Sequence, residues 1–177
     1  TGFCGVGYSY KIARVGLHEW EEPCICGKNG AGAVFFSGCN LKCCYCQNYI
    51  LSHENFGREI SDERLSEIFL ELQEKGACNI DLVTPTPYVY DIIKALDRIK
   101  NRLDIPVVYN CGGYERPETI KMLNGYIDIY LPDFKYYDNS YALKYSGIPD
   151  YFENASESIK EMISQTGKII IDDDNIM

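Results

Sequence analysis

The sequence predicts an α/β fold: a partial (βα) barrel with parallel strands and with helices outside them. Four short apolar runs of strand-like composition occur at 33–37, 79–84, 105–110 and 127–131. Segments with helical periodicity separate these runs, and such alternation is typical of parallel sheets with right-handed crossovers. The chain has 177 residues, whereas a complete eight-stranded barrel needs roughly 250. We therefore expect an open arc of strands with an exposed edge at its fourth strand.

Helices are expected after each of these strands. Ser61 is a suitable N-cap for the first helix, Gly76 is a suitable stop for it, and Pro117 suits the first turn of the third. The segment 168–171 is expected to form a last strand or an extension. The expected helices are 62–75, 89–103, 117–125, 138–145, and one that begins at a capping box over 154–157 and ends at Gly167.

The sequence before the first predicted strand has a different character. Residues 1–32 are rich in Gly and lack helical periodicity, so we expect an irregular, Cys-containing lead-in followed by the partial barrel domain over 33–177. Cys4, Cys24 and Cys26 lie in this lead-in. They are either remnants of a second metal site or small buried residues.

Composition and charge restrict the classes of protein. The net charge of −9 argues against a nucleic-acid partner, and no apolar run approaches the length of a membrane span. Nine cysteines, four of them within eight residues, point to a metal or catalysis in a reducing compartment rather than to disulfides. We expect a cytoplasmic protein that works anaerobically. Because the chain begins at Thr1 without a Met, we also expect a fragment truncated at both ends.

The densest chemical signal is the cysteine loop after Gly38. Cys39, Cys43 and Cys46 form a C-x3-C-x2-C set, which can supply three thiolates to one [4Fe–4S] cluster and leave one iron open for chemistry. The alternative is a non-enzymatic iron–sulfur or zinc-binding module that transfers electrons. In that module Cys44 or a cysteine of the lead-in would supply a fourth ligand.

The motif and its flanks resemble the radical S-adenosylmethionine (SAM) superfamily, and within it the uncharacterised relatives of pyruvate formate-lyase activating enzyme. The strings that carry the resemblance are 16–23, 34–39 and 45–49, including the aromatic Tyr45 before the last cysteine. The resemblance implies a [4Fe–4S] cluster whose open iron binds SAM, and reductive cleavage of SAM to a 5′-deoxyadenosyl radical that abstracts hydrogen. It also implies a one-electron donor such as flavodoxin or ferredoxin, and a protein substrate with a glycyl radical is one option.

The resemblance also suggests residues that bind SAM, and Tyr45 is one of them. Asp133 and Lys135 resemble an Asp-x-Lys pair at the fourth strand, where a carboxylate and a cation suit the zwitterionic methionine end of SAM; the alternative is a surface ion pair. Thr84 and Thr86 replace the usual Gly-Gly-Glu after the second strand and could accept a hydrogen bond from the SAM amino group. Asn110 is placed near the ribose, or else caps a turn. The substrate is not indicated.

Overall fold

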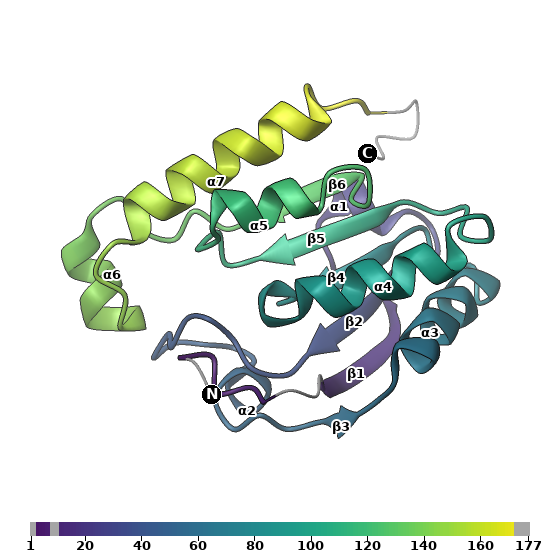
Figure 1. Ribbon diagram of the computed structural model, residues 1–177, viewed down its shortest axis with the longest axis horizontal. Helices are drawn as coiled ribbons and strands as arrows, with labels where there is room; N and C mark the ends of the chain where they lie inside the picture. The colour runs from purple at the N-terminus through teal and green to yellow at the C-terminus, as the bar shows by residue number, and fades with distance from the viewer. Residues whose placement is uncertain (1–2, 8–10, 172–177) are drawn as a thin grey trace.

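The computed structural model describes residues 3–7 and 11–171 of the chain, and these form one six-stranded sheet with helices packed on it (Figure 1). The strand order across the sheet is β3-β1-β2-β4-β5-β6. The strands are β1 (Lys11–His18), β2 (Ala31–Phe36), β3 (Arg58–Glu59), β4 (Ile80–Val83), β5 (Val107–Cys111) and β6 (Ile129–Pro132). The helices are α1 (Pro23–Cys26), α2 (Tyr49–Ser52), α3 (Asp62–Glu74), α4 (Val89–Ile99), α5 (Pro117–Met122), α6 (Asn139–Ser146) and α7 (Tyr151–Thr166), with a 3-10 turn at Thr86–Tyr88.

The four expected strands are present as β2, β4, β5 and β6. Each pairs with the next in parallel, so their carboxyl ends meet at one edge of the sheet. The α/β class and the parallel arrangement of these four strands are therefore confirmed. The sheet as a whole is mixed, because β1 and β3 add two antiparallel pairings beside β2. Closure of the parallel strands into part of a barrel remains a prediction.

The expectation of an irregular lead-in was wrong. β1 runs antiparallel to β2 for most of its length, from Ile12 opposite Phe36 to His18 opposite Ala31. The register shifts between Ile12 and Arg14, and this irregularity breaks the two-residue alternation by which a strand is recognised in a sequence. Only Ile12 of the strand is buried, so the apolar signal was also weak.

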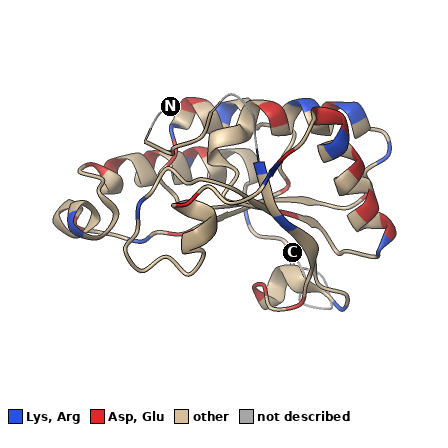
Figure 2. Ribbon diagram, turned by 90° about the horizontal axis from the view of Figure 1, so that it is seen from below, with Lys and Arg blue, Asp and Glu red and all other residues tan. Residues whose placement is uncertain are grey.

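The longer helices lie together on one face of the sheet (Figures 1 and 2). The side chains of α3 and α4 form the main core with alternate residues of the strands, such as Val34, Leu82 and Tyr109. Ser61 caps α3 as expected, because its hydroxyl accepts a hydrogen bond from the amide of Arg64 at 3.2 Å. The charged side chains are concentrated on the helices and loops (Figure 2).

The start of α7 differs from the prediction. The helix begins at Tyr151, so Asn154 lies inside its first turn and does not cap it. The side-chain amide of Asn154 instead donates to the carbonyl of Asp150 at 2.7 Å, a bond that a side chain in the first turn can make. The earlier start buries Tyr151 completely, and this burial stabilises the added turn.

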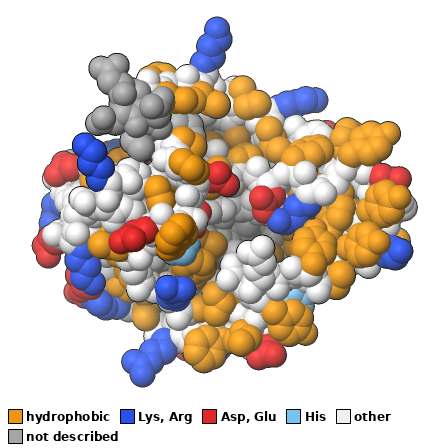
Figure 3. Space-filling model, turned by 180° about the vertical axis from the view of Figure 1, so that it is seen from behind, with side chains coloured by type: hydrophobic (Ala, Val, Ile, Leu, Met, Phe, Trp, Pro, Cys, Tyr) orange, Lys and Arg blue, Asp and Glu red, His pale blue; other side chains and the backbone are white. Residues whose placement is uncertain are grey.

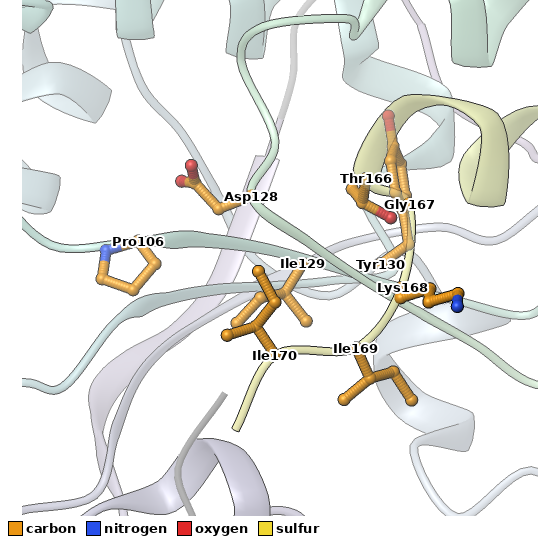
Figure 4. A pocket seen from close by; sticks show the side chains of 9 residues that line it. All are labelled: Pro106, Asp128, Ile129, Tyr130, Thr166, Gly167, Lys168, Ile169 and Ile170. Atoms are coloured by element: carbon orange, nitrogen blue, oxygen red, sulfur yellow. The ribbon is translucent and has the colours of Figure 1, made fainter. Parts of the chain in front are cut away.

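β6 forms an edge of the sheet, as expected for the fourth parallel strand. The segment after α7 runs beside this edge as an extension without strand pairing, and together they enclose an apolar cavity of about 270 Å³ (Figure 4). Ile129 of the strand and Ile170 of the extension face each other across it. The acidic residues 172–174 lie outside the described residues. None of the described helices is long and apolar enough to cross a membrane.

Candidate functional site

A large cavity lies over the face of the sheet opposite the main helices and opens at the carboxyl ends of the parallel strands. Its volume is about 710 Å³. Three parts of the chain line it: the cysteine loop, the ends of β4, β5 and β6, and the turn of the lead-in around Glu21. Figure 3 shows the hollow near the centre of one face, with hydrophobic side chains gathered beside it toward α6. Ligand sites of α/β proteins commonly lie at this edge.

Gly38 directs the chain from β2 into the cysteine loop. Its φ is +80°, and a Cβ at this position would lie 3.1 Å from the carbonyl oxygen of Cys4, so the turn favours glycine. The loop is then tied to the end of α6 by two backbone hydrogen bonds. The amide of Lys42 donates to Ser146 at 3.1 Å, and that of Cys44 donates to Tyr145 at 2.9 Å. The loop is therefore held by a segment distant in the sequence.

Cys39, Cys43 and Cys46 all line the cavity, and each sulfur has a polar neighbour. Hydrogen bonds to sulfur stabilise the thiolate form, which is the form that binds iron. The sulfur of Cys39 accepts from the amide of Leu41 at 3.4 Å, that of Cys43 accepts from the hydroxyl of Ser146 at 2.9 Å, and that of Cys46 lies 3.1 Å from the hydroxyl of Ser52.

The three thiols share one electrostatic environment. Burial and, to a smaller extent, the charges of Cys43 and Cys46 together raise the pKa of Cys39 to about 11. A bound metal cluster would reverse this effect, because its positive charge stabilises thiolates. Among the described residues, no three His, Cys, Asp or Glu side chains are arranged to hold a single metal ion. A four-iron cube attaches each thiolate to a different iron, and so the residues present fit a cluster better than one ion.

The other cysteines have separate surroundings. Cys44 is exposed and does not line the cavity, although its neighbour Cys43 does. Cys26 is buried, and its sulfur lies 3.5 Å from the carbonyl oxygen of His18. Cys24 and Cys4 are partly buried. In the part of the chain that the structure describes, these lead-in cysteines form no second metal-binding group.

Five of the six residues suggested for SAM binding line the cavity: Tyr45, Thr84, Asn110, Asp133 and Lys135. The backbone of Thr84 has φ +58°, a left-handed conformation that is unusual for threonine, and its amide donates to the carbonyl of Asn110 at 2.9 Å. The sixth residue, Thr86, does not line the cavity. Its hydroxyl instead donates to the buried carboxyl of Glu115 at 2.5 Å.

Asp133 and Lys135 follow the end of β6 and form an ion pair with each other. Burial lowers the pKa of Lys135, but the hydrogen bond and the charge of Asp133 outweigh this effect and raise it. The charges of Cys43 and Cys39 also act on this lysine, which places its ammonium near the cysteine loop. The pair lies at the wall of the cavity, and its role in SAM binding stays a prediction.

The hydroxyl of Tyr151 makes hydrogen bonds to the segment that carries Asp133 and Lys135, and this role was not anticipated from the sequence. Tyr151 is completely buried, and its hydroxyl lies 2.8 Å from the carbonyl oxygens of both Gly112 and Asp133. The same oxygen accepts a hydrogen bond from the amide of Lys135 at 2.9 Å. Tyrosines are abundant in this chain, which has 15 of them, and no sequence signal distinguished this one.

The lead-in contributes more to the cavity than expected. His18 and Trp20 line the cavity, as do Glu21 and Glu22. α1 then lies against the sheet, because the amide of Asn79 donates to the carbonyl of Ile25 at 2.6 Å. The missed signal was the density of acidic and aromatic residues in a turn directly after a strand.

These features define an α/β protein with a cavity lined by three cysteine side chains at the carboxyl ends of parallel strands. Residues 33–171 match the radical SAM superfamily. The uncharacterised protein MJ0674 of Methanocaldococcus jannaschii is 31% identical over 161 residues, which cover 86% of this chain and 46% of that protein. The chain belongs to the radical SAM superfamily. It spans about half the length of the curated relative that it matches.

Proposed function

We propose that this chain is the cluster-binding and SAM-binding part of an iron–sulfur enzyme that cleaves SAM reductively. Membership of the radical SAM superfamily supports this assignment. The observation that carries it is the position of Cys39, Cys43 and Cys46, which open from one loop onto a cavity that Asp133 and Lys135 also reach. A cavity of about 710 Å³ is within the range of small-molecule sites.

The three cysteines would hold a [4Fe–4S] cluster, and the polar residues at the strand ends would orient SAM. Lys135 can receive the carboxylate of SAM and Asp133 its ammonium, in exchange for their present ion pair. Thr84 and Asn110 line the same cavity. When bound, the cluster supplies one electron, which breaks the bond between sulfur and C5′ of SAM. The products are methionine and a 5′-deoxyadenosyl radical that removes a hydrogen atom from the substrate.

The finer assignment is to the enzymes that activate glycyl-radical partners. The flanks of the motif support it: Tyr45 before the last cysteine, and Gln47 and Asn48 after it. In that case the substrate is a backbone glycine of a partner protein, and the electron comes from flavodoxin or ferredoxin. The exposed Tyr45 and Tyr49 beside the cysteine loop offer contact area for such a partner.

A non-enzymatic metal module is the second candidate, and the hydrogen bonds to the thiols would serve it equally well. It requires a fourth protein ligand. Cys44 is exposed and does not line the cavity, which disfavours it in this role. The absence of a single-ion arrangement among the described residues also disfavours zinc.

Anaerobic reconstitution with iron and sulfide, followed by EPR of the reduced protein with and without SAM, tests the proposal. We expect a [4Fe–4S] signal that changes when SAM is added. Cys43→Ala should abolish SAM cleavage, while Cys44→Ala serves as the matched control with an adjacent thiol and should retain it. A cluster that ignores SAM, or equal loss of cleavage in both variants, would contradict the proposal.

A further inference from the structure

A group of acidic side chains forms the floor of the cavity, away from the cysteine loop. Glu21 and Glu22 line it directly. Asp81, on β4, lies in the same face of the sheet, because its neighbours Ile80 and Leu82 pack into the main core and Val83 lines the cavity. The cross-strand partners of Asp81 are Ala33 and Val108. Asp81 is therefore a buried acidic residue close to Glu21 of the cavity wall.

Asp81 is completely buried, and neither of its carboxyl oxygens has a partner with full hydrogen-bond geometry among the described residues; the side chains of Asn110 and Glu21 are its polar neighbours. An ionised carboxylate in such a position is costly unless a cation or a donor meets it. Burial and, to a smaller extent, the charge of nearby Glu21 together raise the pKa of Asp81 to about 7. The charge of Glu21 therefore disfavours the ionised form of Asp81, and a positive group beside the two carboxyl groups would relieve this.

The described part of the chain supplies little positive charge there. Glu21 pairs only with His18, at 3.7 Å, and no Lys or Arg nitrogen within the described residues comes within 4 Å of Asp81. The two basic residues of the cavity wall have other partners. Lys135 pairs with Asp133, and the guanidinium of Arg14 lies 5.9 Å from the centre of the Phe35 ring.

We propose that this acidic floor, Glu21 with Asp81 close to it, binds a cationic group of the substrate, an ammonium or a guanidinium. Trp20 lines the same end of the cavity and is 87% exposed, so its ring is available to pack on such a cation. The inference rests on the proposed function in one respect: the group is bound so that the reacting part of the substrate faces the cysteine loop at the other end of the cavity. The group can belong to a free amine or to a side chain of a protein substrate.

Trp20 is the single tryptophan of the chain, and so its emission reports on this site. The reconstituted protein is titrated with butylguanidinium and, separately, with the uncharged isostere butylurea. We expect a saturable change with the cation and at least a tenfold weaker effect with the urea. N-acetylarginine amide forms a second arm. Tighter binding of this amide would indicate a cation carried by a protein substrate. Tighter binding of butylguanidinium would indicate a cation carried by a small molecule.

Three variants locate the binding. Glu21→Gln and Asp81→Asn should each weaken butylguanidinium at least tenfold, and Glu21→Gln alone remains decisive if Asp81→Asn fails to fold. Glu19→Gln removes the same charge from an exposed residue of the same turn that does not line the cavity, and should change affinity less than twofold. Equal binding of the cation and the urea, or unchanged affinity in Glu21→Gln, overturns the proposal. The tryptophan emission reports cation binding and does not depend on SAM cleavage. A failure of the proposed function is therefore distinguishable from a failure of this inference.

Discussion

The hydroxyl of Ser146 donates a hydrogen bond of 2.9 Å to the sulfur of Cys43, and both side chains are buried. The serine oxygen also lies 2.6 Å from the hydroxyl of Tyr136, which lies 2.5 Å from that of Tyr45. A chain of three hydroxyls therefore connects the cavity wall to one cysteine of the proposed cluster site. Such bonds to sulfur adjust the reduction potential of iron–sulfur clusters.

Ser146→Ala should make the reduction potential of the reconstituted cluster more negative. A hydrogen bond to a thiolate stabilises the negative charge that builds up on reduction, and its loss removes this stabilisation. The hydrogen bond is stronger to the reduced cluster than to the oxidised one. If this difference in free energy reaches the value of one hydrogen bond, about 1 kcal/mol, the potential shifts by about 40 mV for one electron. An EPR-monitored redox titration measures it.

Ser140→Ala is the matched control, because Ser140 is an exposed serine on the same helix, α6. The reduction potential of the cluster in Ser140→Ala should equal that in the unaltered protein. An equal shift in both variants would mean that the effect comes from the helix and not from the hydroxyl next to Cys43. A potential unchanged in Ser146→Ala would show that this bond does not persist when the cluster is bound.

The local features of the fold could be predicted from the sequence, because they depend on neighbouring residues. The cap at Ser61, the turn at Gly38 and the four parallel strands were each indicated by a short pattern, and the structure has them. The position of the three cysteines at the carboxyl end of β2 was predicted in the same way. β1 was missed because a register shift and a single buried residue left no regular pattern.

The features that support the site could not be predicted, because they join residues distant in the sequence. Ser146 lies 103 positions from Cys43. Thr86 was placed toward SAM because its neighbour Thr84 follows the same strand. The 3-10 turn at Thr86–Tyr88 instead directs its hydroxyl to Glu115, 29 positions away. Only tertiary packing decides such orientations.

The Glu115 carboxyl should make stability depend on pH. It is almost completely buried and accepts hydrogen bonds from Thr86 and Tyr109, yet burial raises its pKa from 4.5 to about 7. Since the folded protein holds this proton more tightly than the unfolded chain, the contribution of Glu115 to stability is fully present below about pH 4.5 and is lost as the pH rises toward 7. The loss is up to about 3 kcal/mol.

Glu115→Gln removes this titration and keeps an oxygen for the Thr86 hydroxyl. The variant should be more stable than the unaltered chain at pH 8, and its unfolding free energy should fall less between pH 5 and 8. Urea unfolding of the cluster-free chain at several pH values measures both quantities. Glu118→Gln, at an exposed position in the same region, should leave the pH profile unchanged. Identical profiles for the two variants would contradict the assignment.

Tyr151→Phe should destabilise the segment that carries Asp133 and Lys135. The phenylalanine fills the same space but leaves the carbonyls of Gly112 and Asp133 and the amide of Lys135 without their shared partner. We expect a loss of about 1–3 kcal/mol in unfolding free energy, and weaker SAM binding to the reconstituted protein.

Tyr137→Phe removes a hydroxyl from a side chain that is 84% exposed and serves as the control, with an expected change below 0.5 kcal/mol. Urea unfolding gives the stabilities, and the SAM concentration that half-changes the EPR signal gives the affinities. If Tyr151→Phe loses stability but binds SAM normally, the tyrosine supports the fold and does not position the Asp133 segment.

Gly113→Ala tests how closely the loop after β5 must approach that segment. Gly113 has φ +75°, and a Cβ there would collide with the carbonyl oxygen of Asp133 and lie 3.0 Å from the Tyr151 hydroxyl. Gly125 offers a matched comparison, because its φ is +82° and a Cβ would meet nothing within 4 Å. Gly125→Ala should therefore cost only the left-handed backbone penalty, about 1–2 kcal/mol.

Gly113→Ala should cost at least about 1 kcal/mol more than Gly125→Ala, because the collision is with backbone atoms and cannot be relieved by turning a side chain. Urea unfolding of the two variants side by side isolates the steric part, since both carry the same backbone penalty. The displaced carbonyl would also move Asp133 and Lys135 at the rim of the cavity, so SAM binding should weaken in Gly113→Ala alone. Equal stabilities for the two variants would show that the loop can retreat from Asp133 freely, and that its close approach does not fix the ion pair.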